Sequence, residues 1–152
     1  MCYKVKNFRG NTLVIFIYRI SHTLWRWKIP VIPRLLYGIN RVLFSVVLPP
    51  SAVLGKDVLL AYNGLATVIH ARCRIGNRVQ ISQGVTLGGR SGLFEVPVIE
   101  DDVQIGAGAK ILGPIVIGRG AKIGANAVVL QNVPIGATFV GVPARNVSSV
   151  DS

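Results

Sequence analysis

The sequence contains two histidines, His22 and His70, and histidine is the side chain best suited to accept a proton near neutral pH. His70 directly follows the aliphatic Ile69, whereas His22 lies among basic and aromatic residues nearer the N-terminus. We therefore take His70 as the first candidate for a general base, which would accept a proton from an attacking hydroxyl group. The alternative is a solvent-exposed histidine with no chemical role.

A break in the spacing of aliphatic residues lies just before His70. Aliphatic residues otherwise recur every six positions, but Leu60 and Ile69 are nine positions apart. The three extra residues predict a bulge or small loop, and loops on a rigid scaffold often carry function. We expect this loop to bring Tyr62 and Asn63 beside His70 as further catalytic candidates. The alternative is that the slip only marks an irregular first repeat.

The six-residue period itself covers most of the chain after residue 50. Twelve successive positions, each six residues after the last, all carry Ile, Leu or Val: Ile69, Ile75, Ile81, Leu87, Leu93, Ile99, Ile105, Ile111, Ile117, Ile123, Val129 and Ile135. Whether Leu93 lies inside is left open, because Phe94 to Pro97 has the composition of an excursion. A period of six fits short strands that keep two alternate residues inside and then turn a corner.

A second column of mostly small residues lies two positions before the first. Its members are Thr67, Cys73, Val79, Val85, Val103, Ala109, Ile115, Ala121, Ala127 and Val133. Three strands then form one triangular coil of eighteen residues, and coils stack at the inter-strand spacing of about 4.8 Å. The sequence therefore predicts a mainly β solenoid with Cys73 in its core.

These repeats resemble the hexapeptide-repeat acyltransferases with a left-handed parallel β-helix, most closely the serine acetyltransferase branch and its relatives in polysaccharide gene clusters. The segments that carry the resemblance are 84–89 (GVTLGG), 105–113 (IGAGAKILG), 120–126 (GAKIGAN) and 141–145 (GVPAR). The resemblance implies an acetyl-CoA-dependent O-acetyltransferase that forms homotrimers with each active site between adjacent subunits. It implies L-serine, or a sugar hydroxyl in polysaccharide biosynthesis, as the acceptor.

Three positions depart from the serine acetyltransferase pattern. The catalytic histidine of that family falls on Asn63 and its preceding aspartate on Tyr62, while a second histidine beside the acceptor falls on Val96. His70 is the only histidine in the repeats. The overall match to the family favours serine as the acceptor, whereas the missing histidines and the basic N-terminus favour a sugar hydroxyl. The missing histidines also leave open a catalytically silent scaffold or regulatory subunit.

A column of small residues suggests where the cofactor lies. With eighteen residues per coil, Ala71, Gly89, Ala107, Ala125 and Pro143 should stack along the solenoid and leave a shallow stripe beside His70. An extended pantetheine arm would fit there, although small residues can also serve only to turn the corner.

Two cations are expected at the phosphates of CoA near the C-terminal end, namely Lys122 and Arg145. Lys122 matches a lysine of the family. The resemblance and the stripe together make Gly89, Ala107, Lys122, Ala125 and Arg145 the predicted cofactor-binding residues, and no metal site is predicted.

Residues 1–50 differ in composition from the repeats. They carry eight of the 17 basic residues, no acidic residue and eight of the eleven aromatic residues, and they end at Pro49-Pro50. We expect a helix with one apolar face over residues 12–29 and a second helix over 34–47. This extension would cap the solenoid, lie on an anionic membrane surface, or do both. The chain thus divides into 1–50, the repeat domain 51–146 and the tail 147–152.

The remaining expectations concern compartment and partners. Two cysteines provide no disulfide framework, and the longest early apolar run, residues 13–18, is far shorter than the roughly 20 residues that span a bilayer. With no signal peptide recognised, we expect a cytoplasmic protein, with the inner face of the membrane as a further location. The basic residues belong to no recognised nucleic-acid-binding motif, so nucleic acid is not an expected partner.

Overall fold

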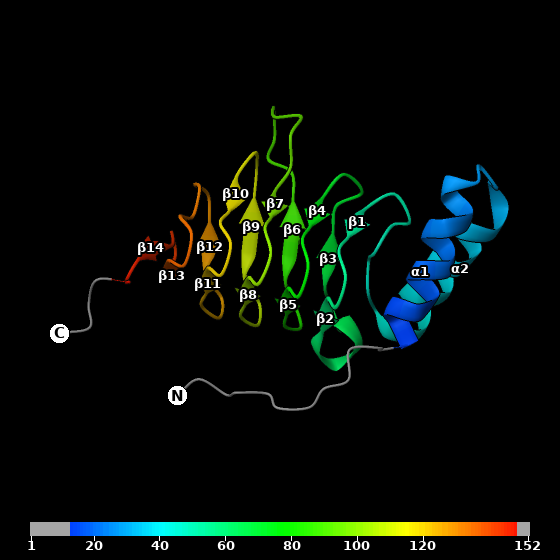
Figure 1. The fold of residues 1–152 in the computed structure, drawn as a ribbon, viewed down its shortest axis with the longest axis horizontal. Coiled ribbons are helices and arrows are strands. Elements are labelled where there is room, and N and C mark those ends of the chain that lie inside the picture. The colour runs from blue at the N-terminus through cyan, green and yellow to red at the C-terminus, as the bar shows by residue number, and fades with distance from the viewer. Residues whose placement is uncertain (1–12, 149–152) are drawn as a thin grey trace.

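The computed structural model describes residues 13–148, in which a helical hairpin stands at one end of a solenoid of short strands (Figure 1). The hairpin consists of α1 (Leu13–Arg26) and α2 (Val31–Phe44). The strands are β1 (Val53–Leu54), β2 (Leu59–Leu60), β3 (Val68–Ile69), β4 (Arg74–Ile75), β5 (Gln80–Ile81), β6 (Thr86–Gly88), β7 (Val98–Ile99), β8 (Gln104–Ile105), β9 (Lys110–Leu112), β10 (Val116–Ile117), β11 (Lys122–Ile123), β12 (Val128–Val129), β13 (Thr138–Val140) and β14 (Arg145–Asn146). A 3-10 turn, η1 (Ala61–Gly64), follows β2.

The strands form the three faces of a triangular β-helix. One sheet has the order β1-β4-β7-β10, the second β12-β9-β6-β3 and the third β14-β13-β11-β8-β5-β2. Apart from the antiparallel pair β13 and β14, the paired strands are parallel, and each strand pairs with the equivalent strand of the next coil. The predicted mainly β solenoid is therefore confirmed.

The two inward columns form the core. All ten members of the small-residue column are buried, Cys73 and Thr67 included. Ten of the twelve positions in the Ile/Leu/Val column are buried as well, but Leu93 is 47% exposed and Ile135 is 76% exposed. Leu93 lies in a loop that leaves the coil after β6, and the last coil is two residues short, so Val133 instead of Ile135 pairs with Ile117.

Four coil lengths occur, 16 residues in the last coil and 18, 21 or 24 in the others, and they determine which residues stack. Eighteen residues separate paired residues at Val68 and Thr86, and 21 separate Leu59 from Gln80, because η1 takes up the three extra residues predicted there. Thr86 pairs with Lys110, a separation of 24, because the loop over residues 89–97 adds six. That loop therefore changes which corner each later residue occupies.

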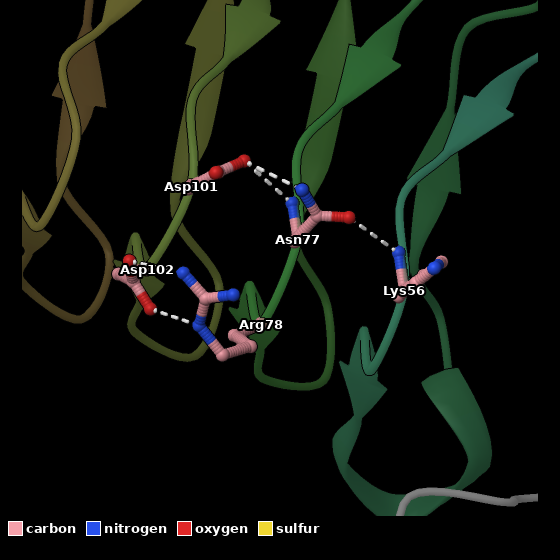
Figure 2. Close-up of polar contacts among 5 residues, drawn as sticks. All are labelled: Lys56, Asn77, Arg78, Asp101 and Asp102. Carbon is pink, nitrogen blue, oxygen red and sulfur yellow. Dashed lines mark hydrogen bonds and ion pairs between the residues drawn. The ribbon is translucent and has the colours of Figure 1, made fainter.

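One corner of the triangle, after β1, β4, β7 and β10, is a polar ladder (Figure 2). The Lys56 N–H donates to Asn77 Oδ1 at 2.8 Å, and the Asn77 N–H donates to Asp101 Oδ1 at 2.8 Å. Arg78 binds Asp102 in a bidentate pair, at 2.6 and 2.8 Å. Hydrogen bonding from Asn77 lowers the pKa of Asp101, and hydrogen bonding from Arg78 lowers that of Asp102. We call this the ladder corner, and its acids have a structural role.

The helical hairpin caps the first coil, as one of the two expectations for residues 1–50 stated. Tyr18 donates to the carbonyl of Ala52 at 2.5 Å, and Arg19 donates to the carbonyl of Leu54 at 2.9 Å. The helices begin and end near the predicted bounds, but α2 starts three residues earlier than expected, with Pro33 inside its first turn, where a missing N–H costs nothing. Among residues 13–148, neither helix has the length and apolar character needed to cross a bilayer.

Candidate functional site

The candidate residues lie at the other two corners of the triangle. The glycine corner precedes β3, β6, β9 and β12 and consists of residues 61–66, 82–84, 106–108 and 124–126. The histidine corner follows the same strands and includes residues 70–72 and the loop 89–97. The strands of one sheet therefore separate the two groups of candidates.

Tyr62 and Asn63 lie in η1 at the glycine corner. Both have left-handed backbone angles, with φ of 51° and 55°, and the Tyr62 side chain is 75% exposed. Asn adopts this region readily, but Tyr does so at a cost on the order of 1 kcal/mol or more. The three extra residues of this coil thus present two polar side chains outward in a strained turn.

The glycine corner continues along the solenoid as a column of small residues. The Gly108 N–H donates to the Gln83 carbonyl at 2.9 Å, and the Asn126 N–H donates to the Ala107 carbonyl at 2.8 Å. A Cβ on Gly106 would lie 2.6 Å from the backbone nitrogen of Ala125, so this position requires glycine. Glycine and alanine occupy residues 106–108 and 124–125 of the column, whereas the Lys110 side chain reaches its other end, where Nζ donates to the Gly84 carbonyl at 2.6 Å.

Lys122 and Arg145 lie on the sheet that leads into the glycine corner. Lys122 is on β11, three residues before Ala125, and pairs with Thr138 of β13. Arg145 is on β14 and pairs with Val140 of the same β13. Both side chains belong to exposed residues, so two cations flank the C-terminal end of the column.

His70 lies at the histidine corner, where its Nδ1 accepts the Arg72 N–H at 3.2 Å. A neutral ring in this arrangement carries its proton on Nε2, which can donate a hydrogen bond. To act as a base, His70 must first release Arg72 from Nδ1. The Arg72 guanidinium in turn stacks 3.8 Å from the centre of the Phe94 ring and donates to the Phe94 carbonyl.

The expectation that Tyr62 and Asn63 lie beside His70 is wrong within one chain. They precede β3 and His70 follows it, and from Thr67 at the start of that face to His70 the chain covers about 10 Å. A base must lie within hydrogen-bond reach of its proton donor. The three candidates cannot act together on one acceptor from the same subunit.

The predicted stripe of five small residues is also wrong as a continuous column. Ala71 and Gly89 lie at the histidine corner, but the six residues added by the loop move Ala107 and Ala125 to the glycine corner. Lys122 pairs with Thr138, so the last coil has 16 residues instead of 18. Gly141, and not Pro143, therefore continues the column after Ala125. Of the predicted cofactor residues, Gly89 alone is separated from the others.

Three features of these corners were not recognised in the sequence. Gln83 and Gly108 belong to the glycine column, and Arg72 holds the loop through Phe94. Val96 is buried, with its Cγ1 3.8 Å from where a Cβ on Gly89 would lie, so it anchors the loop and presents no polar group. Burial raises the pKa of Cys73 to about 11, which keeps its thiol protonated in the core.

Comparisons with known proteins agree with this fold. The family model described as bacterial transferase hexapeptide (six repeats) matches residues 97–131. Serine acetyltransferase from Bacillus subtilis is 41% identical over 135 residues, covering 88% of this chain and 62% of the relative. The enzyme of the same name from Escherichia coli K12 is 46% identical over 137 residues, covering 89% and 50%.

Solved structures are equally similar. A serine acetyltransferase in complex with CoA has a TM-score of 0.82 at 43% identity, covering 88% of this chain and 55% of the other. A soybean serine acetyltransferase complexed with serine has a TM-score of 0.84 at 42% identity, covering 89% and 56%. The chain thus spans between half and about three-fifths of the length of these relatives. The expected resemblance is confirmed: the repeats match the hexapeptide transferase family model, and most of this chain is similar in sequence and in structure to serine acetyltransferases.

Proposed function

We propose that this protein is an acetyl-CoA-dependent O-acetyltransferase that acts on a hydroxyl acceptor, either L-serine or a sugar hydroxyl in polysaccharide biosynthesis. The observation that carries the proposal is the glycine corner, where the small residues Ala107 and Ala125 lie on adjacent coils and Lys122 and Arg145 supply two cations. The same coils align with a serine acetyltransferase whose structure was solved with CoA. A column of small residues suits an extended pantetheine arm, and cations suit its phosphates.

The transfer forms an ester C–O bond and breaks the thioester C–S bond, so the hydroxyl proton must reach the departing sulfur. Asn63 can orient an acceptor through its amide, but an amide cannot take up that proton near neutral pH. His70 can, once its Nδ1 is free; in its present tautomer its Nε2–H can instead donate to the developing oxyanion. Both roles require His70 near the glycine corner.

We propose that a neighbouring subunit supplies that proximity in a homotrimer. The histidine corner of one subunit would face the glycine corner of the next, because the two corners of one chain lie on opposite sides of β3. Sedimentation at micromolar concentration should then give a mass near three times 16.3 kDa. A fully active monomer would contradict this arrangement.

The activity is tested by the release of free thiol from acetyl-CoA, with serine and a panel of sugars as acceptors. Thiol release that depends on an acceptor, together with a mass increase of one acetyl group on that acceptor, would support the proposal. Release that is the same with and without every acceptor would refute acetyl transfer.

A catalytically silent scaffold is the second candidate, and the substitutions at two positions favour it. Asn63 stands where the serine acetyltransferase pattern has its catalytic histidine, and the second histidine is replaced by Val96, which is buried. This candidate predicts that the protein binds CoA without transferring acetyl to any acceptor. Binding measured by calorimetry beside the thiol assay separates the two functions.

We also propose that the protein is cytoplasmic and that residues 1–50 bring it to the inner face of the membrane. The support is the charge of this segment, which has eight basic residues and no acidic residue.

A further inference from the structure

The outer face of α2 is an apolar surface with no partner in the part of the chain that the structure describes. Its buried residues are Pro33 and Asn40, both on the side that contacts α1: the Pro33 carbonyl accepts Ser21 Oγ at 3.0 Å, and Asn40 Nδ2 donates to the Val14 carbonyl at 3.2 Å. On the opposite side Val31 is 70% exposed and Val42 is 81% exposed, with Leu35 between them. An exposed helix face this apolar indicates a surface that packs against an apolar partner or a lipid bilayer.

Basic residues border this apolar face and continue around the turn of the hairpin. Two shallow hollows share Arg34: one runs along α2 past Leu35 and Val42, and the other, at the turn, is lined by Trp25, Arg26 and Lys28. Trp27, also at the turn, is 70% exposed. Apolar, aromatic and cationic side chains thus form one continuous surface, which we call the hairpin face.

We propose that the hairpin face binds an anionic phospholipid bilayer, with α2 lying in the plane of the headgroups. Arg26, Lys28 and Arg34 would contact the lipid phosphates, and Leu35 and Val42 would enter the acyl boundary. Tryptophan favours the same interface because its ring is amphipathic. This inference specifies the membrane contact proposed above and does not depend on the acetyl transfer.

Charge favours a bilayer over a second copy of the chain as the occupant. Residues 13–50 contain five Arg or Lys and no Asp or Glu. Two hairpin faces brought together would oppose cations with cations, whereas an anionic bilayer pairs with all of them. Among the described hairpin cations, Arg19 is already bound to the Leu54 carbonyl, so the others supply the attraction.

The two tryptophans of the chain report directly on this contact. Both Trp25 and Trp27 lie at the hairpin turn, so their fluorescence arises where the bilayer would bind. Titrating the full chain with phosphatidylcholine vesicles containing phosphatidylglycerol should shift the emission to the blue, and vesicles of phosphatidylcholine alone should not. High salt should weaken the binding, because it screens the cations.

Two variants test the surface, each with a matched control on the coils. The triple variant Arg26→Gln, Lys28→Gln, Arg34→Gln should weaken binding about 100-fold, since each basic residue near the surface contributes roughly five-fold. The control removes the same charge from the solenoid and consists of Lys56→Gln, Arg74→Gln and Arg119→Gln. Its affinity for the anionic vesicles should fall much less than that of the triple variant. All six side chains belong to exposed residues, so the fold should be kept, as circular dichroism will check.

The second variant, Leu35→Gln with Val42→Gln, should reduce binding at least ten-fold at unchanged charge, and its control on exposed residues of the coils is Val116→Gln with Ile135→Gln. Equal losses in variant and control would overturn the proposal, as would a wild-type chain that ignores phosphatidylglycerol. The wild-type chain could instead bind no bilayer and associate with itself in the absence of vesicles. If the changes at Leu35 and Val42 abolished that association, the hairpin face would bind a second copy of the chain and the proposal would be wrong. Thiol release with soluble acceptors should be unchanged in all four proteins, which separates this test from that of the acetyltransferase.

Discussion

Replacing Ala107 by tryptophan should block the glycine corner. Ala107 is half-buried in the column, and the next coil, which carries Ala125, lies about 4.8 Å away. An indole ring at position 107 is longer than that spacing, so it would cover Ala125 as well. A pantetheine arm would lose its contact with two coils.

The expected loss follows from the apolar contact removed. Three or four methylene equivalents at about 0.8 kcal/mol each amount to about 3 kcal/mol, which is roughly a 100-fold increase in KM for acetyl-CoA. The turnover at saturation should change much less, because Ala107 does not take part in the chemistry. The assay is thiol release over a range of acetyl-CoA concentrations, with CoA affinity measured separately by calorimetry.

Ile135→Trp is the matched control, because it adds the same ring to an exposed position after β10, at the ladder corner. Its KM for acetyl-CoA should equal that of the wild type. If folded Ala107→Trp also binds acetyl-CoA with wild-type affinity, the arm does not lie at the glycine corner and the reasoning fails.

Three further predictions concern His70, Tyr18 and the ladder corner. His70→Ala should lower turnover by about 10²- to 10⁴-fold with little change in acetyl-CoA affinity. His70→Gln should keep part of the wild-type turnover only if the ring acts as a hydrogen-bond donor and not as a base. Wild-type turnover in both variants would show that His70 has no part in the mechanism. Burial raises the pKa of Tyr18 to about 12 from 10.0. The buried, protonated phenol therefore contributes fully to the free energy of unfolding below pH 10, and this contribution is lost as the pH rises toward 12. Tyr18→Phe should remove this loss of stability from a series of denaturation curves measured at alkaline pH. Hydrogen bonds from the backbone N–H and the side chain of Asn77 lower the pKa of Asp101, so stability should fall as the pH drops below the usual range of a carboxyl group. Asp101→Ala removes the titrating group and should lower stability at pH 7 and flatten that decline; an acid transition unchanged in this variant would show that Asp101 does not stabilise the fold.

The solenoid could be predicted because its core repeats in the sequence. Every coil needs two inward residues on each face, so the period of six and the buried columns follow directly from packing. The slip of three residues before β3 was visible for the same reason, since it breaks the period. The helices were recognisable from their apolar faces, although only the structure shows that Pro33 lies within the first turn of α2.

The stacking of the site residues could not be predicted, because the loop over residues 89–97 adds one full repeat length. Six extra residues leave a six-residue period intact, and Leu93 even supplies an aliphatic residue at the expected step while lying outside the coil. Every later residue therefore keeps its inward or outward direction but moves to a different corner. This is why Gly89 and Ala107, eighteen apart in the sequence, lie at different corners.

The positions of the catalytic candidates depended on strand geometry that the spacing did not reveal. His70 and Asn63 are seven residues apart, which in a compact loop would allow contact. Strand β3 lies between them and is extended, so it separates them. A site that uses both must therefore draw on two subunits.

The most direct test of that claim is to mix two defective chains in one trimer. His70→Ala leaves the glycine corner intact, and Ala107→Trp leaves the histidine corner intact. If each site takes one corner from each of two neighbours, random co-assembly restores about a quarter of the wild-type sites, because each intact corner is present with a probability of about one half. The account predicts that co-expressed chains recover roughly this fraction of wild-type thiol release at low acetyl-CoA. No recovery above the average of the two parent variants, in trimers shown to contain both chains, would contradict a site shared between subunits.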